Sequence, residues 1–179
     1  MLGRKLLALA MLVVLLLAAT AVQAAPPQTE WSVVADLNRV FTPTAIRTGH
    51  VTFTQAADGT VSLSFDVTFT WECLDGAPSV ERWTGSATSG VTLTVAKNLS
   101  SAAAASGVFG GGYSRTSTCL GDVADVAIGE VTFSPDAISK TERERTADGV
   151  RVLTRPASGF LMLGSIMETV SAEIVKEIG

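Results

Sequence analysis

Two cysteines and one histidine are the residues of this chain whose chemistry is easiest to define. Cys73 and Cys119 are the only cysteines, and His50 is the only histidine, among 179 residues. A cysteine nucleophile needs an adjacent base such as an imidazole, and nothing in the sequence links His50 to either cysteine. An even cysteine count is typical of disulfide bonding where a chain is exported, and the N-terminal segment described below predicts export. We therefore expect a structural disulfide between Cys73 and Cys119 and an ordinary surface position for His50.

Carboxylates suggest two further kinds of chemistry, calcium binding and glycoside hydrolysis. Calcium binds to clustered oxygen ligands. The candidate ligand sets are Asp122, Asp125 and Glu130, and Glu72, Asp75 and Glu81. Neither set matches an EF-hand loop. Glycosidases use two carboxylates about 5–10 Å apart, whereas Asp66 and Glu72 would lie about 20 Å apart on one extended strand. The sequence therefore predicts no cofactor, and a hydrolytic pair would have to come from different strands.

Aromatic side chains are the candidates for recognition, because binding surfaces are enriched in them. Trp83 lies in a polar segment, and Phe109 and Tyr113 flank the glycine run at 110–112. That run lacks the Lys-Ser/Thr of a phosphate-binding loop, so it indicates flexibility. Trp71 shares an apolar face with Cys73, and we expect it to pack in the core against the disulfide.

The N-terminus has the three parts of a secretory signal peptide. Arg4 and Lys5 precede an apolar run over 6–19, and Val22-Gln23-Ala24 supplies the small residues of a cleavage site. As a helix the run would reach about 21 Å, too short for a bilayer core of about 30 Å. We expect cleavage after Ala24, and we expect residues 25–179 to form one secreted, extracellular domain without stable membrane insertion.

Charge excludes one class of partner for the mature chain. The sequence has 13 basic and 17 acidic residues, and removal of Arg4 and Lys5 with the signal peptide leaves a net charge of −6. Nucleic-acid binding depends on Lys and Arg contacts to phosphate, and anionic membranes attract basic segments. We therefore expect no nucleic-acid partner. The partner is expected to be a protein or a glycan, and the chain is expected to be a monomer.

Alternating apolar and polar residues predict an all-β fold. From Val61 to Cys73 every second residue is apolar, which is typical of an antiparallel strand with one buried face. Asp58-Gly59 favours a hairpin turn between this strand and the segment 50–55. Further strands are predicted at 31–37, 79–86, 91–97, 113–119, 127–133, 150–154 and 170–175. Many short strands at this spacing favour a β-sandwich or barrel, and a core-facing disulfide that ties two sheets favours the sandwich.

Three segments are less regular. Residues 99–112 combine an alanine run with glycines, and we expect a long flexible loop there. The charged stretch 140–145 is expected to be a solvated loop or an exposed strand. The last apolar residues fit either a helix or a strand, and we expect a strand.

With these segments in place, the chain resembles the small secreted immunoglobulin-like proteins of actinobacteria. The resemblance covers roughly Val51 to Asp136. It lies in the entry Asp58-Gly59-Thr60-Val61, the strand into Trp71-Glu72-Cys73, Val91-Thr92-Leu93-Thr94, Ser117-Thr118-Cys119-Leu120-Gly121 and Val131-Thr132-Phe133-Ser134-Pro135-Asp136. It implies an immunoglobulin-like antiparallel β-sandwich with one inter-sheet disulfide. It implies no chemistry, because a fold does not fix a function.

These observations favour a secreted, non-catalytic protein that acts in surface recognition or as a cell-envelope accessory. Two alternatives stay open. One is a small secreted hydrolase whose carboxylates converge only in the fold. The other is an inhibitor that presents the loop 99–112 to an extracellular protease.

Overall fold

The structure is a computed structural model that describes residues 28–107 and 111–179. Within these ranges the chain forms β-strands and no helix, so the all-β prediction is confirmed, and no apolar helix of membrane-spanning length is found there. The strands are β1 (Thr29–Thr42), β2 (Ala45–Gln55), β3 (Val61–Glu72), β4 (Pro78–Ala87), β5 (Val91–Val95), β6 (Ala102–Ser106), β7 (Gly111–Ser117), β8 (Val123–Ala127), β9 (Val131–Ala137), β10 (Glu142–Arg145), β11 (Arg151–Leu163) and β12 (Ile166–Ile178). The expected signal peptide, 1–24, and Phe109 lie outside the described residues.

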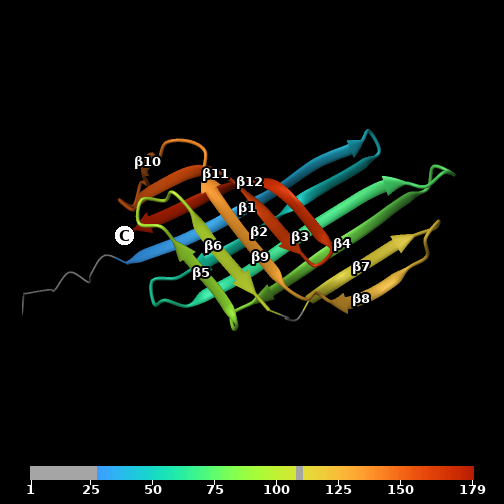
Figure 1. The fold of residues 1–179 in the computed structure, drawn as a ribbon, viewed down its shortest axis with the longest axis horizontal. Helices are drawn as coiled ribbons and strands as arrows, with labels where there is room; N and C mark the ends of the chain where they lie inside the picture. Colours follow the sequence, from blue (N-terminus) through green and yellow to red (C-terminus); the bar gives the residue numbers. More distant parts are fainter. Residues whose placement is uncertain (1–27, 108–110) are drawn as a thin grey trace, which may run out of the picture.

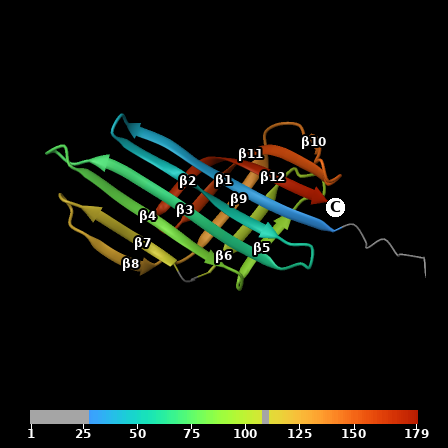
Figure 2. The same ribbon diagram turned by 180° about the vertical axis from the view of Figure 1, so that it is seen from behind.

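All the described strands belong to one antiparallel sheet (Figure 1). Their order is β5-β6-β9-β11-β12-β1-β2-β3-β4-β7-β8, with β10 paired to β11 off this path. The sheet curls into a half-barrel, so β5, β6 and β9 cross over the inner face of β2, β3 and β4 (Figures 1 and 2). The predicted immunoglobulin-like sandwich is corrected here: the two layers are parts of a single sheet, and they are not separate sheets.

The hairpin of β11 and β12 makes the sheet continuous. Along its whole length β11 pairs with β12. Near the C-terminus β12 also pairs with β1, from Thr29–Ile178 to Asp36–Ser171. The C-terminal part of β11 also pairs with β9, from Ala157–Ala137 to Leu163–Val131. One hairpin therefore belongs to both layers, and the bend between them lies within it.

Small residues lie where the sheet bends. Four alanines face one another across β9, β11, β12 and β1: Ala137, Ala157, Ala172 and Ala35. Next to this row, a Cβ atom on Gly159 would lie 2.6 Å from Pro135 Cα. Side chains this small leave room for the inner face to close tightly, since interiors are close-packed. Gly159 is needed because the backbones of β9 and β11 approach each other there.

The core lies between the two layers. Its largest fully buried side chains include Phe53 of β2, Phe133 of β9 and Leu161 of β11. From the crossing layer, β5 lies against β2 and β3 and contributes Leu93. Removal of this apolar surface from water is the main stabilising term of the fold.

Several local predictions are confirmed. Leu63, Phe65 and Val67 of β3 are buried, as the alternating pattern predicts. The hairpin of β2 and β3 forms as expected, and its turn is stabilised by Asp58 Oδ1, which accepts a hydrogen bond from Thr60 N at 2.8 Å. The C-terminal segment is a strand, β12, and the charged stretch contains the exposed strand β10.

Two predicted boundaries are wrong. The segment 99–112 is not one long loop, because its alanine run forms β6, which pairs with β5 and β9, and β7 begins at Gly111. Ala102 and Ala104 are buried, so long-range pairing overrides the low strand propensity of alanine. The single strand predicted at 127–133 is divided between β8 and β9.

Candidate functional site

Three hairpin ends project beyond the crossing layer on the same side of the molecule. They are the ends of β1–β2, β3–β4 and β7–β8, and they lie together at the right of Figure 1 and at the left of Figure 2. The inner face of β1, β2, β3, β4 and β7 is not covered by β5, β6 and β9 near these ends. Side chains that follow the core pattern along these strands therefore reach a more open surface.

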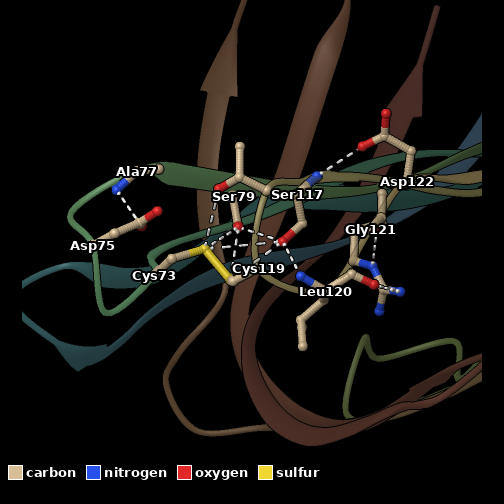
Figure 3. Close-up of a disulfide and its surroundings, with 11 residues drawn as sticks. Cys73, Asp75, Ala77, Ser79, Ser117, Cys119, Leu120, Gly121 and Asp122 are labelled. Atoms are coloured by element: carbon tan, nitrogen blue, oxygen red, sulfur yellow. Dashed lines mark hydrogen bonds between the residues drawn. A yellow bond between two sulfur atoms is a disulfide. The ribbon is translucent and has the colours of Figure 1, made fainter.

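The disulfide joins two of these hairpin ends. Cys73 follows β3 and Cys119 follows β7, and the two strands flank β4 in the sheet order. The cysteine pairing is as predicted, but the bond connects positions within one sheet, so the expected inter-sheet role is corrected (Figure 3). Its mechanical effect is to fix the β3–β4 turn against the β7–β8 turn.

Two buried serines support the disulfide from β4 and β7. Ser79 Oγ and Ser117 Oγ lie 2.7 Å apart, and Ser79 Oγ lies 3.1 Å from Cys73 Sγ. Ser117 Oγ also accepts a hydrogen bond from Leu120 N at 3.1 Å. These contacts pair polar groups that would otherwise be costly to bury.

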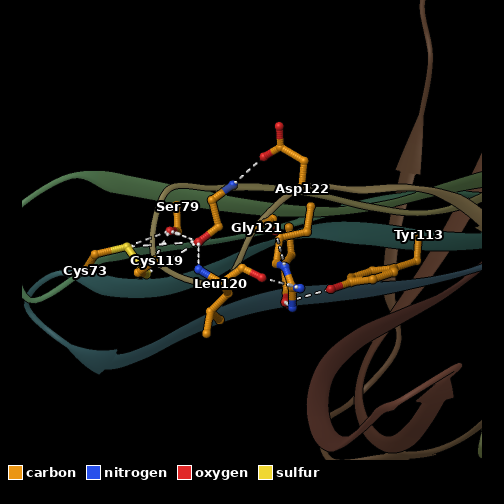
Figure 4. A network of polar contacts seen from close by, with 10 residues as sticks. Cys73, Ser79, Tyr113, Cys119, Leu120, Gly121 and Asp122 are labelled. Atoms are coloured by element: carbon orange, nitrogen blue, oxygen red, sulfur yellow. Dashed lines mark hydrogen bonds and ion pairs between the residues drawn. A yellow bond between two sulfur atoms is a disulfide. The ribbon is translucent and has the colours of Figure 1, made fainter.

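Further hydrogen bonds stiffen the two turns. Asp75 Oδ1 accepts from Ala77 N at 3.0 Å in the β3–β4 turn. In the β7–β8 turn, Arg115 donates to the carbonyls of Leu120 and Gly121, each at 3.1 Å, and Asp122 accepts from the backbone N–H of Ser117 (Figure 4). Both turns therefore have fixed shapes, and the disulfide fixes their separation.

Each stiffened turn carries an exposed leucine directly after its cysteine. Leu74 is fully exposed and Leu120 is 58% exposed. A shallow depression of about 590 Å³ lies beside them, lined by Trp71, both cysteines and both leucines, together with Glu72 and Asp75. We call the surface formed by Trp71, Leu74 and Leu120 the leucine tip.

Aromatic rings continue this surface along the inner face. Trp71 is only half-buried, and it stacks on Phe69 with ring centroids 5.2 Å apart. Phe41 of β1 meets Phe69 edge-on at 5.4 Å and is 43% exposed. Trp71 therefore lines the same depression as the disulfide, but the expectation that it packs in the core is wrong, because it does not belong to the core cluster.

The three aromatic residues predicted for recognition differ in their burial and contacts, and one of them is not described by the structure. Trp83 is 3% exposed and packs on Tyr113 with centroids 5.3 Å apart, so its ring is not available to a partner. Tyr113 is half-buried and donates its hydroxyl to Glu81 Oε1 at 2.8 Å. Burial, and then the hydrogen bond to Glu81, raise the pKa of Tyr113 above its ordinary value. Phe109 is outside the described residues.

The calcium candidates are not brought together. Asp122 is used in the β7–β8 turn, Asp125 is exposed on β8, and Glu130 precedes β9. Neither this set nor Glu72, Asp75 and Glu81 forms a group that could hold a metal ion, and no other such group is found in residues 28–107 and 111–179. His50 is exposed on β2, opposite Asp66 of β3.

Sequence reasoning missed a charge cluster on the inner face, centred on the buried Glu168. Glu168 of β12 accepts hydrogen bonds from Arg39 of β1 and Arg47 of β2, at 3.2 and 3.3 Å. The guanidinium of Arg47 also lies 5.1 Å from the ring centroid of Phe41. The signal was present, because Glu168 occupies an inward position in the alternating series of Ile166, Val170, Ala172 and Ile174.

Comparisons were made with protein-family models, with curated proteins and with solved structures, and none of them matches this chain.

Proposed function

We propose that this chain is an exported, non-catalytic binding protein that recognises a partner protein through the leucine tip. The observation that carries the proposal is the position of Leu74 and Leu120, each directly after one cysteine of the same disulfide and each exposed. Covering one leucine stabilises a complex by about 1.5–3 kcal/mol. Exposed apolar side chains that line one depression are typical of a protein interaction site.

The rigidity of the two turns supports the proposal. Association costs free energy when flexible loops become ordered, and a surface held in its bound shape avoids that cost. The disulfide, Ser117, Arg115 and Asp75 all restrict the two turns before any partner arrives. Two exposed leucines on mobile loops would not have this advantage.

The chemistry of the leucine tip favours a protein partner over a glycan. Sugars stack on aromatic faces, but the one aromatic ring of the leucine tip, Trp71, is half-buried and stacks on Phe69. Leu74 and Leu120 are its exposed side chains, and they present aliphatic groups that fit an apolar protein pocket. Glu72 and Asp75 line the same depression. Because complementary charges favour association, the partner is expected to have an apolar centre with basic residues at its rim.

Export is supported by the N-terminal sequence and by the disulfide. The N-terminal signal at 1–24 would direct the chain out of the cytoplasm, where an oxidising environment permits the disulfide. N-terminal sequencing of the exported protein should start at Ala25. A product that retains Met1 would contradict this part of the proposal.

The structural observations bear differently on the inhibitor and the hydrolase alternatives. The inhibitor alternative needs a protruding loop at 99–112, but Leu99, Ala102 and Ala104 are buried beside β5 and β9. For the hydrolase alternative, one observation is favourable: Asp36 and Glu168 line the same cleft. Nitrophenyl glycosides test it directly, since turnover that disappears in Asp36→Asn would support a hydrolase.

Site-specific photocrosslinking tests the proposed interface. Benzoylphenylalanine is placed at position 74, at position 120, or at position 138, where the control residue Ile138 is 69% exposed in the segment between β9 and β10. Each variant is expressed in the cells that naturally export this protein, and the cells are then irradiated. We expect one adduct shared by positions 74 and 120, lost on addition of excess wild-type protein and absent at position 138. An adduct pattern common to all three positions, or none at 74 and 120, would overturn the proposal.

A further inference from the structure

A cleft opens where β12 separates from β1. The two strands are paired from Thr29–Ile178 up to Asp36–Ser171, and there the pairing ends. Beyond it, β1 continues to Thr42 paired with β2, and β12 runs back to Ile166 paired with β11. Along this cleft the backbone groups on the facing edges of β1 and β12 therefore do not hydrogen-bond to each other.

Polar side chains from both strands line the cleft. It has a volume of about 400 Å³, within the range of small-molecule sites. The polar lining consists of Asp36, Asn38, Arg39, Glu168, Thr169 and Ser171. The leucine tip uses none of these residues, so the cleft is a separate feature of the surface.

Glu168 gives an independent indication of a ligand. Its side chain is 2% exposed, and Arg39 and Arg47 both contact Oε2. Oε1 is buried without a hydrogen-bond partner among the described residues, and so is Nε of Arg47. An unpaired buried polar atom costs about 1–3 kcal/mol. Oε1 of Glu168 is therefore an unused acceptor on a residue that lines the cleft.

We propose that this cleft binds a hydroxyl-bearing small molecule, a saccharide or saccharide end. A hydroxyl group both donates and accepts hydrogen bonds, so it can donate to the unused carboxylate oxygen of Glu168 and accept from Arg39, which also lines the cleft. Asp36 and Glu168 disfavour an anionic ligand, and Arg39 disfavours a cationic one. Asn38, Thr169 and Ser171 supply further neutral donors and acceptors to the remaining hydroxyls.

Amide NMR of the mature protein tests this site with named probes. Glucose, galactose, mannose, arabinose, maltose and cellobiose are titrated separately, with acetate and ethylammonium as the anionic and cationic comparisons. We expect at least one sugar to shift the backbone resonances of Asn38, Thr169 and Ser171 in a saturable manner. We expect neither ion to do so.

Variants separate a built site from unspecific contact. Asn38 and Thr169 are exposed, so Asn38→Ala and Thr169→Ala should fold normally and weaken sugar binding about fivefold each, the loss of one net hydrogen bond. Glu168→Gln should weaken it further, and Thr94→Ala on β5 is the matched control. If Glu168→Gln does not fold, Asn38→Ala and Thr169→Ala by themselves test the proposal. No shift with any sugar, or shifts that persist in Asn38→Ala and Thr169→Ala, would refute the proposal. Leu74→Asp should leave sugar binding intact, so this result is independent of the leucine tip.

Discussion

Arg47 Nη1 lies 3.3 Å from Glu168 Oε2, although the two residues are 121 positions apart in the chain. The side chain of Glu168 is 2% exposed and that of Arg47 is 16% exposed, whereas the other partner, Arg39, is 57% exposed. The contact therefore joins β12 to β2 across the intervening strand β1. A buried ion pair and an exposed one behave differently when one partner is lost.

Glu168→Ala should destabilise the fold by about 3 kcal/mol, because Arg47 then keeps a charge without its carboxylate. Arg39→Ala should cost less than about 1 kcal/mol, since Arg39 is largely solvated. Urea denaturation followed by tryptophan fluorescence measures both. Equal losses for the two variants would show that the burial of the pair is not what matters.

Removal of the disulfide should cost roughly 4 kcal/mol, the value that the chain-entropy model gives for a loop of this length. The double variant Cys73→Ala/Cys119→Ala avoids leaving one free thiol. Chemical denaturation compares it with the wild type under oxidising conditions, and reduction of the wild type is the control. A loss near zero would mean that Ser79, Ser117 and their hydrogen bonds suffice to hold the two turns.

Tyr113 is the only tyrosine in the chain, so its titration can be followed directly by the near-ultraviolet absorbance of the phenolate. Its pKa should lie above 10.0, because burial and then Glu81 disfavour the phenolate. Glu81→Gln should lower that pKa. Because the unfolded chain loses this proton first, stability should fall as pH rises from about 10 to the folded-state pKa. A phenol that titrates at or below 10.0 would contradict this geometry.

Asp66 and Arg82 form an exposed pair on β3 and β4, with Nη2 2.6 Å from Oδ2. The hydrogen bond from Arg82 lowers the pKa of Asp66 below 3.8. Its contribution to stability is therefore present above that value and is lost as pH falls through the folded-state pKa. Asp66→Asn should be slightly less stable than wild type at pH 7. The two proteins should converge in acid, and thermal melts across this range measure the difference.

Gly49 is required by a close approach within the sheet. It has a φ of 140°, and a Cβ atom there would lie 2.2 Å from the carbonyl oxygen of Asp66. Gly49→Ala should cost about 3 kcal/mol through steric overlap and backbone strain. Gly129→Ala is the matched control, because a Cβ atom there meets nothing within 4 Å. Urea midpoints that shift equally for both variants would contradict this explanation.

The local pattern predicts individual strands well, but it does not determine how they assemble. Leu63, Phe65 and Val67 point inward whether their strand belongs to a sandwich or to a curled sheet, so alternation cannot distinguish the two. The two folds differ at β11 and β12, which are longer than the strands predicted at 150–154 and 170–175. These two strands pair with strands of both layers. Such pairing depends on long-range contacts that no local window contains.

The candidate site was only partly predictable for a similar reason. The pairing of Cys73 with Cys119 follows from an even cysteine count, and the position of Leu74 and Leu120 beside it could have been read from the same two residues. Glu168 was also visible, as a carboxylate on an apolar face. Its partners were not, because Arg39 and Arg47 approach it only through the bend of β12 away from β1.

The double pairing of the C-terminal hairpin has a consequence for the way the chain is made. Residues 151–179 are synthesised after the other described strands, yet they occupy the middle of the sheet between β9 and β1. Until they arrive, the N-terminal strands and the crossing strands have no shared neighbour, and two unpaired strand edges stay available for aggregation. A chain that stops before β11 would lack the centre of its sheet, so no strand would join its two layers.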